Sequence, residues 1–396
     1  MRRIHYPVLL RNVEEAKAGT FVGLFTLEAI CRALLATIVP LLAYKYLQDA
    51  QRVTLLYLVL NAIGLVVGFT LPMLLHAVAR RWVLTVGCLF YIVAGFGLAR
   101  ADLTGLVIGL SGQVLGTALL ELTINLYLLD HIPRRDLNHF EPRRLLFSGT
   151  AFAAGPWLGV WLHTNLYENT TFYLVALIAV ALTGYFWRQR LGDNEALQAA
   201  TGPPPNPLRF LPRFLAQPRL VLAWTLAVGR NGWWLMFFVY VPIFVIEAGL
   251  DPQIGGALVS LGVAPMLLVR QWGRLGARYG IRQLLVASYS VCGVFTAAAG
   301  WFSGDPWISI VLLWLAAFTA TVIDGAGNVP FLRAVHTYER SEMTSVFMTF
   351  RYATSLLMPA LFAIVLTARP VSAVFIAGGG VAIAMAALSR YLPRRL

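Results

Sequence analysis

Charged residues are scarce in this chain. Of its 396 residues, only 12% are Asp, Glu, Lys or Arg, and 59% are hydrophobic. Soluble domains carry about a quarter charged residues, so the composition excludes an ordinary soluble protein and predicts one that crosses a lipid bilayer repeatedly. No cleavable signal peptide is evident, because residues 1–17 have no apolar core before their Arg and Glu residues. We expect the first spanning helix to direct insertion itself.

The residue groups that carry enzyme chemistry are also lacking. The three cysteines, Cys31, Cys88 and Cys292, are scattered in separate apolar segments without metal-ligand spacing. No G-x-x-x-x-G-K-[ST] loop is present to hold a nucleotide phosphate, which argues against ATP-driven pumping by this chain alone. No nucleophile–base pair stands out among the buried positions. We therefore expect a protein that is not an enzyme and that uses neither a metal nor a cofactor.

What the chain has instead is twelve apolar segments near the length of a spanning helix, about 20 residues. Barrel strands alternate polar and apolar residues over about ten positions, whereas these segments are longer and continuously apolar. The predicted fold class is an all-α membrane protein with twelve transmembrane helices. The predicted spans are Gly19–Tyr44, Val53–Leu75, Val83–Leu98, Leu103–Leu129, Leu145–His163, Thr171–Trp187, Leu220–Ile246, Ile254–Gly273, Leu284–Trp301, Trp307–Val329, Met343–Leu366 and Val371–Leu392.

One long polar connection divides these spans six and six. It contains Gly202-Pro-Pro-Pro-Asn-Pro207 and several arginines, and proline runs favour extended, semi-rigid backbone. We predict an N-terminal six-helix bundle at 1–187, a cytoplasmic linker at 188–219 and a C-terminal six-helix bundle at 220–396. The other loops are mostly short and leave little room for a soluble domain.

The net charge of +13 is unevenly placed along the chain. Both termini and the alternate loops on their side hold most of the 31 Lys and Arg residues. Only four fall in loops on the opposite side: Lys45, Arg52, Arg100 and Arg369. This asymmetry is typical of the positive-inside rule and predicts a multi-pass protein of the inner (plasma) membrane with both termini in the cytoplasm. No basic soluble domain interleaved with aromatics is present, so we expect no nucleic-acid partner.

The two halves repeat each other at a nearly fixed offset. The matched residues are Pro40 and Pro242, Glu121 and Asp324, Asn125 and Asn328, and Pro156 and Pro359. The offset is 202 positions for the first match and 203 for the others. Matches in register across three helix pairs predict a duplication, and hence two pseudo-symmetric bundles with a site at their interface.

One loop carries a family resemblance. The segment Gly273-Arg-Leu-Gly-Ala-Arg-Tyr-Gly-Ile-Arg282 resembles the cytoplasmic signature loop G-x-L-a-D-r-x-G-r-r of the major facilitator superfamily (MFS), and the chain resembles that family over essentially its whole length. The match departs at Ala277, where the family typically has Asp. The resemblance implies a gating loop, here with a different gate contact, built on Gly273, Gly276, Arg278, Gly280 and Arg282.

A second resemblance lies in the fifth predicted span. Gly149 followed by Gly155-Pro-Trp-Leu-Gly159 is similar to a partial version of the family's G-P-x-x-G antiporter motif. The residues that carry it are Gly149, Gly155, Pro156 and Gly159. The partial motif modestly favours export over uptake.

Six charged residues inside the spans form the candidate site. Glu28, Glu121, Asp324, Arg230 and Arg351 lie roughly 12–15 Å from the predicted cytoplasmic ends, and Arg32 lies one turn deeper. The three acids can neutralise the three arginines as fixed ion pairs. Alternatively, a proton or a substrate competes for the arginines, because a carboxylate changes its charge and a guanidinium does not. The resemblance implies that helices 1, 4, 7 and 10 line a central cavity, which adds Asn125, Asn231 and Asn328.

Aromatic residues crowd the seventh predicted span. Trp233, Phe237 and Tyr240 share one face, where a flat, partly apolar substrate could stack. Packing or lipid-facing roles are the alternative, since aromatic residues are common in membrane helices.

These patterns together predict an MFS-type secondary active transporter. It would export a small organic solute in exchange for protons as a monomer in the lipid bilayer. Uptake of a small organic anion, drawn by the arginines, is the second transport hypothesis. A non-transporting membrane receptor or assembly factor on the same fold is the alternative from another class.

Overall fold

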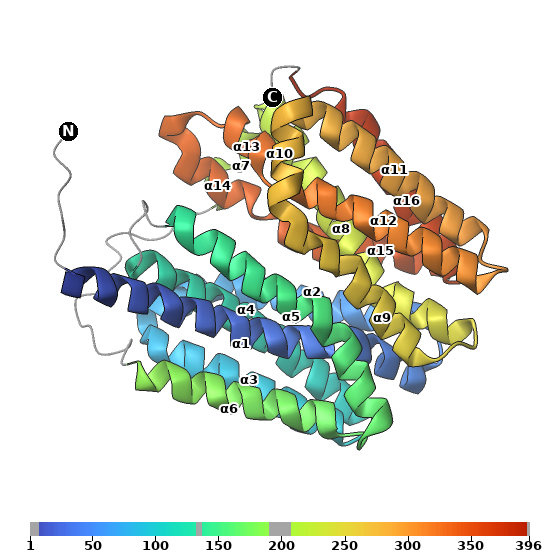
Figure 1. The fold of residues 1–396 in the computed structure, drawn as a ribbon, viewed down its shortest axis with the longest axis horizontal. Coiled ribbons are helices and arrows are strands. Elements are labelled where there is room, and N and C mark those ends of the chain that lie inside the picture. Colours follow the sequence, from blue (N-terminus) through green and yellow to red (C-terminus); the bar gives the residue numbers. More distant parts are fainter. Residues whose placement is uncertain (1–7, 132–136, 190–206, 394–396) are drawn as a thin grey trace.

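The computed structural model describes residues 8–131, 137–189 and 207–393, and all regular elements in these ranges are helices. The first half packs as one bundle of helices lying side by side (Figure 1). Its helices are α1 (Val8–Leu47), α2 (Ala50–Ala77), α3 (Arg80–Ala99), α4 (Leu103–His131), α5 (Leu137–Asn165) and α6 (Thr170–Arg188).

The second half contains the same number of spans but more helical pieces, because three of its spans are interrupted. Its elements are α7 (Pro207–Leu215), α8 (Pro218–Glu247), α9 (Pro252–Val263), the 3-10 helix η2 (Ala264–Leu268), α10 (Val269–Tyr279), α11 (Ile281–Trp301), α12 (Pro306–Ala326), α13 (Val329–Ala334), the 3-10 helix η3 (Thr337–Glu339), α14 (Arg340–Phe347), α15 (Phe350–Leu366) and α16 (Ser372–Ser389). The interruptions are η2, the pair Gly327 and Asn328, and the pair Met348 and Thr349.

Twelve helical stretches of the described chain are long and apolar enough to cross a bilayer. They correspond one to one with the twelve predicted spans, so the predicted fold class is confirmed. Several predicted ends were wrong by a few residues. The eighth span, predicted as Ile254–Gly273, covers Pro252–Tyr279, because the glycines and arginines after Gly273 continue the helix.

Part of the predicted linker is helical. Residues 190–206, which hold most of the proline run, lie outside the described residues. After them, α7 packs on α14 next to Glu339, the last residue of η3, whose carboxylate is only 4% exposed. The Gln217 amide donates to Glu339 Oε2 at 2.9 Å, and Arg213 Nη2 lies 3.0 Å from its Oε1. The hydrogen bond from Gln217, with help from Tyr338 and Arg213, holds the pKa of Glu339 below its usual range.

Small residues let the helices approach closely in both halves. A Cβ placed on Gly95 of α3 would contact the carbonyl oxygen of Phe172 on α6. In the second half, a Cβ on Gly300 of α11 would contact the carbonyl oxygen of Ser372 on α16. Membrane helices gain little from apolar burial in lipid and depend on such close backbone packing. The contact of α3 with α6 and the contact of α11 with α16 occupy equivalent places in the two halves, in agreement with the repeat in the sequence.

The halves meet along three helix pairs, α5 with α9, α2 with α15 and α1 with α8. We call the end of the molecule at which α7 lies the linker end, and the opposite end, where α1 and α8 finish, the far end (Figure 1). Near the far end, the Gln253 amide donates to Thr164 Oγ1 at 3.1 Å. Thr54 Oγ1 and the Tyr240 hydroxyl lie 2.7 Å apart and share a hydrogen bond. These bonds join the two halves at the far end.

Candidate functional site

The first acid–arginine pair lies within α1. Arg32 Nε is 2.7 Å from Glu28 Oε1, one helical turn away. The Glu28 side chain is only 3% exposed, whereas that of Arg32 is 33% exposed. Both atoms are buried, and the contact between them is an ion pair without a hydrogen bond. Because buried ions are stable only with good geometry and satisfied hydrogen bonds, this pair has unused capacity for another donor or acceptor.

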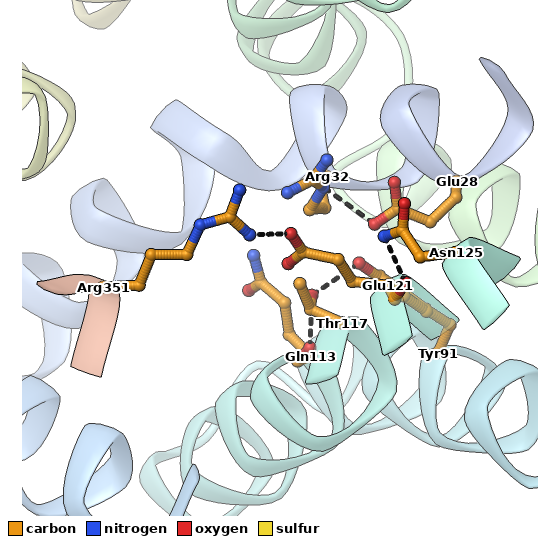
Figure 2. A network of polar contacts seen from close by, with 8 residues as sticks. All are labelled: Glu28, Arg32, Tyr91, Gln113, Thr117, Glu121, Asn125 and Arg351. Carbon is orange, nitrogen blue, oxygen red and sulfur yellow. Dashed lines mark hydrogen bonds and ion pairs between the residues drawn. The ribbon is translucent and has the colours of Figure 1, made fainter. Parts of the chain in front are cut away.

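The second pair connects the two halves. The Arg351 guanidinium on α15 donates from Nη1 to Glu121 Oε1 on α4 (Figure 2). Its side chains are the most open of the three pairs, 51% exposed for Arg351 and 35% for Glu121. The ion pair therefore connects the two bundles, and its carboxylate is accessible to a proton or a solute.

The third pair belongs to the second half. Arg230 Nε lies 3.5 Å from Asp324 Oδ1, and the two side chains are 15% and 13% exposed. The Trp234 indole N–H donates to Asp324 Oδ2 at 2.6 Å. Arg230 Nη2 donates to Asn328 Oδ1 at 3.1 Å. This pair is more enclosed and better satisfied by hydrogen bonds than the pair between the halves.

The Asp324 and Asn328 side chains do not share a helix. The predicted span Trp307–Val329 placed both on one continuous helix, and this was wrong, because α12 ends at Ala326 and Asn328 is the residue before α13. Gly327 makes the break with φ +52° and ψ −129°. Only glycine adopts this backbone region readily, since it has no Cβ. The break nevertheless leaves both side chains in contact with Arg230.

We expect Gly327→Ala to lower thermal stability, because a Cβ in this backbone conformation costs about 1–3 kcal/mol. Thermal unfolding of the purified protein in detergent measures the loss. Gly304→Ala is the matched control, since an added Cβ there meets nothing within 4 Å. Equal unfolding midpoints for the two variants would show that a Cβ at position 327 causes no backbone strain.

The α4 face carries two further polar residues that were not predicted as members of the site. Gln113 and Thr117 precede Glu121 and Asn125 at intervals of four, so the four residues share one helix face. Asn125 Nδ2 donates to the Glu121 carbonyl at 2.6 Å. Figure 2 shows Gln113 beside Glu121, and Gln113 Oε1 is buried without a hydrogen-bond partner. The stripe was visible in the sequence as a spacing of four.

Tyr91 of α3 completes the polar cluster around α4. Its hydroxyl lies 2.7 Å from Thr117 Oγ1 and shares a hydrogen bond with it (Figure 2). On α8, the predicted cavity residue Asn231 is half-buried next to Arg230, and its side chain has no partner among the described residues.

The predicted stacking face is packed against protein. Trp233, Phe237 and Tyr240 are 5%, 0% and 1% exposed. The rings of Trp233 and Phe237 stack with centroids 5.1 Å apart, and Trp233 donates to Thr296 Oγ1 on α11 at 2.9 Å. In this conformation the three rings are covered by neighbouring side chains.

Other aromatic rings lie closer to the charged residues. Phe152 of α5 and Phe238 of α8 meet between the halves with centroids 6.1 Å apart. The Arg32 guanidinium lies 5.5 Å from the centroid of the Phe152 ring, and Trp234 contacts Phe238. The spacing of Trp234 and Phe238 at i and i+4 was a usable signal, whereas nothing in the sequence singled out Phe152.

The helix 5 motif lies where α1, α5 and α9 meet. A Cβ on Gly155 or Gly159 would contact Ala33 or the carbonyl oxygen of Leu34 on α1. Pro156 breaks the regular hydrogen bonding of α5, and the next N–H, from Trp157, donates to Ser260 Oγ of α9 at 2.9 Å.

Gly149 lies on the same helix, opposite Leu267 of η2. The motif therefore joins the helix that carries Glu28 and Arg32 to the second half.

The predicted gating loop is mostly helix. Gly273, Gly276 and Arg278 belong to α10, and α11 begins at Ile281, just before Arg282. The turn between them is Gly280 alone, with φ +84°. The prediction of a loop from Gly273 to Arg282 was wrong, because one glycine at positive φ suffices to reverse the chain. Any gating role of these residues remains a prediction.

The described residues contain no group of three or more His, Cys, Asp or Glu side chains that could hold a metal ion. What the site offers is three exchangeable ion pairs, a row of polar side chains on α4 and an aromatic contact between the halves. Ionisable groups inside membrane spans mark pathways for solutes and protons. Two bundles of spans with such groups at their interface define a membrane transporter.

The comparison with protein families agrees with this class. Residues 21–335 match the Major Facilitator Superfamily, so the chain belongs to that family and is a transporter of a solute. A search of curated proteins finds no match.

Solved structures resemble the chain over almost its full length. The nucleoside transporter NupG has a TM-score of 0.73 at 15% identity, covering 95% of this chain and 98% of that chain. A POT family transporter in complex with a thioalcohol-conjugated peptide has a TM-score of 0.72 at 11% identity, covering 94% and 95%. A bacterial homologue of the iron transporter ferroportin, in an inward-facing state, has a TM-score of 0.69 at 16% identity, covering 95% and 97%. At these identities the likeness concerns the fold.

Proposed function

We propose that this protein exports a small organic solute in exchange for protons. The observation that supports this is the contact between Glu121 and Arg351, the one acid–arginine pair of the site that connects the two bundles. Protonation removes the negative charge of the carboxylate, whereas the guanidinium keeps its positive charge. A proton on Glu121 would therefore weaken the contact between the bundles, and its release would restore the contact.

The proposed solute-binding region lies between this pair and the aromatic contact of Phe152 and Phe238. Arg32 borders both, since it pairs with Glu28 and lies over the Phe152 ring. A partly apolar molecule with one polar group suits such surroundings. The charge distribution of the loops supports placing both termini in the cytoplasm of a cell with an energised plasma membrane.

Uptake of a small organic anion is the second candidate. The observation that favours it is the 51% exposure of the Arg351 side chain. A solute carboxylate or phosphate could displace Glu121 from that guanidinium, because the two parallel N–H groups of arginine pair with two oxygens of either anion. A proton on the displaced Glu121 would then travel with the anion.

The sign of the proton flux distinguishes the two functions. A thermal-shift ligand screen at two pH values first identifies a solute whose binding changes with pH. Proteoliposomes are then loaded with this solute and a pH dye and diluted into solute-free buffer. Exchange predicts that the lumen acidifies as the solute leaves, and cotransport predicts that it becomes alkaline. Solute counterflow without any proton flux would refute both forms of proton coupling.

A further inference from the structure

A groove lies outside the candidate site, on the outer surface of the second half. The groove, of about 600 Å³, opens between α7, the first turns of α8 and the end of α16. This volume is within the range of small-molecule sites. Its lining includes Leu215, Arg219, Val221, Leu222, Leu388 and Tyr391.

The helix α7, which contributes Leu215 to the groove, is amphipathic and held in place. Phe214 is 2% exposed, and Arg213 of α7 binds Glu339 at 3.0 Å. Leu211 and Leu215, one turn apart, point away from the protein with exposures of 38% and 59%. A short helix with a basic side and an exposed apolar side is typical of a segment that lies in the membrane interface.

Arg219 is the charged group of the groove. It is exposed and has no acidic partner among the described residues. It stands in the first turn of α8, where the helix dipole disfavours a cation, so its own helix does not stabilise the charge. Tyr391, 79% exposed, stands on the other side of the groove at the end of α16. Aromatic and basic side chains at the end of a span mark the depth of the lipid headgroups.

We propose that this groove binds an anionic phospholipid. The phosphate pairs with Arg219, and an acyl chain follows Val221, Leu222 and Leu388 along the lipid-facing side of α8 and α16. Charge complementarity selects this occupant over a neutral lipid, because basic pockets at the ends of spans attract anionic headgroups. The bound lipid would connect α7 to α8 and α16 and so stabilise the docked linker helix.

Native mass spectrometry of the full-length protein, titrated with phosphatidylglycerol or phosphatidylcholine, tests the proposal. Wild type is expected to bind phosphatidylglycerol more tightly. Arg219→Gln is expected to weaken that binding about fivefold, the attraction of one basic residue for an anionic lipid. Arg369→Gln is the matched control, an exposed arginine in a loop at the far end, and it should bind as wild type does.

Leu222→Trp tests the contact with the acyl chain independently of the contact with the headgroup, because the larger side chain fills the groove without changing its charge. It is expected to reduce binding of phosphatidylglycerol while keeping the unfolding midpoint measured without added lipid. Equal losses for Arg219→Gln and Arg369→Gln would overturn the proposal in favour of diffuse charge attraction. Competition by inorganic phosphate at the same concentration as the lipid would also overturn it, since the site would then be one for a free anion.

Discussion

Glu121→Gln is expected to abolish proton-driven transport in proteoliposomes while leaving the fold intact. The amide has the same shape but takes up no proton near neutral pH, and its hydrogen bond to Arg351 lacks the ionic contribution. A hydrogen bond to a charged group contributes about 1.5–3 kcal/mol, and loss of the carboxylate charge removes about half of it. The equilibrium between joined and separated bundles therefore shifts by up to about tenfold. The measurement is solute flux driven by an imposed pH gradient.

Glu168→Gln is the matched control for this variant. Its side chain is exposed at the far end and belongs to no ion pair of the described chain, so proton-driven flux should be unchanged. Counterflow of labelled solute in Glu121→Gln reports whether the site still binds and moves its cargo without a proton gradient. If the flux of Glu121→Gln keeps the pH dependence of wild type, Glu121 is not the coupling group, and Glu28 and Asp324 become the candidates.

Asp324→Ala is expected to destabilise the protein more than any substitution of an exposed acid. It leaves Arg230, whose side chain is 15% exposed, without its counter-charge. Removing one partner of a buried ion pair costs about 3–5 kcal/mol. It also removes the acceptor of the Trp234 indole N–H. Thermal unfolding in detergent measures the loss.

Asp49→Ala is the control for this second prediction, because it removes only an exposed pair with Arg52, 3.6 Å apart and worth about 0–1 kcal/mol, and one cap hydrogen bond from the Gln51 N–H, worth about 1 kcal/mol. The double variant Arg230→Met with Asp324→Leu should recover part of the lost stability, since it buries no unpaired charge. If Asp324→Ala and Asp49→Ala lower the unfolding midpoint equally, the charge of Arg230 is not stabilised by Asp324.

The number and order of the spans could be predicted from the sequence, because continuous apolar segments of sufficient length have few alternatives in a membrane. The interruptions of the second half were missed. Two of them had local signals: Pro265 lies in η2, and Gly327 is followed by Pro330 at the start of α13. Glycine with proline shortly after it commonly ends a helix. Met348 and Thr349, in the third interruption, have no such signal.

The candidate site could be predicted in part. A spacing of four within one helix is enough to pair Glu28 with Arg32, and the same spacing places Gln113 and Thr117 on the face of Glu121. Pairing across helices could not be read in the same way. Glu121 and Arg351 are 230 positions apart, and their contact depends on how α4 and α15 are placed by the packing of two bundles. No local pattern encodes that placement.

The three interruptions of the second half have a mechanical consequence. The pieces α10, α13 and α14 are each joined to the rest of their span by a short stretch without continuous α-helical hydrogen bonding. Rotation about a few backbone bonds at these points lets the linker-end pieces pivot. In the first half, α4 runs unbroken through the same depth, and bending it would break backbone hydrogen bonds in a medium that offers no replacement. We therefore expect the hinges of this transporter to be concentrated in one half, with the other serving as a rigid lever.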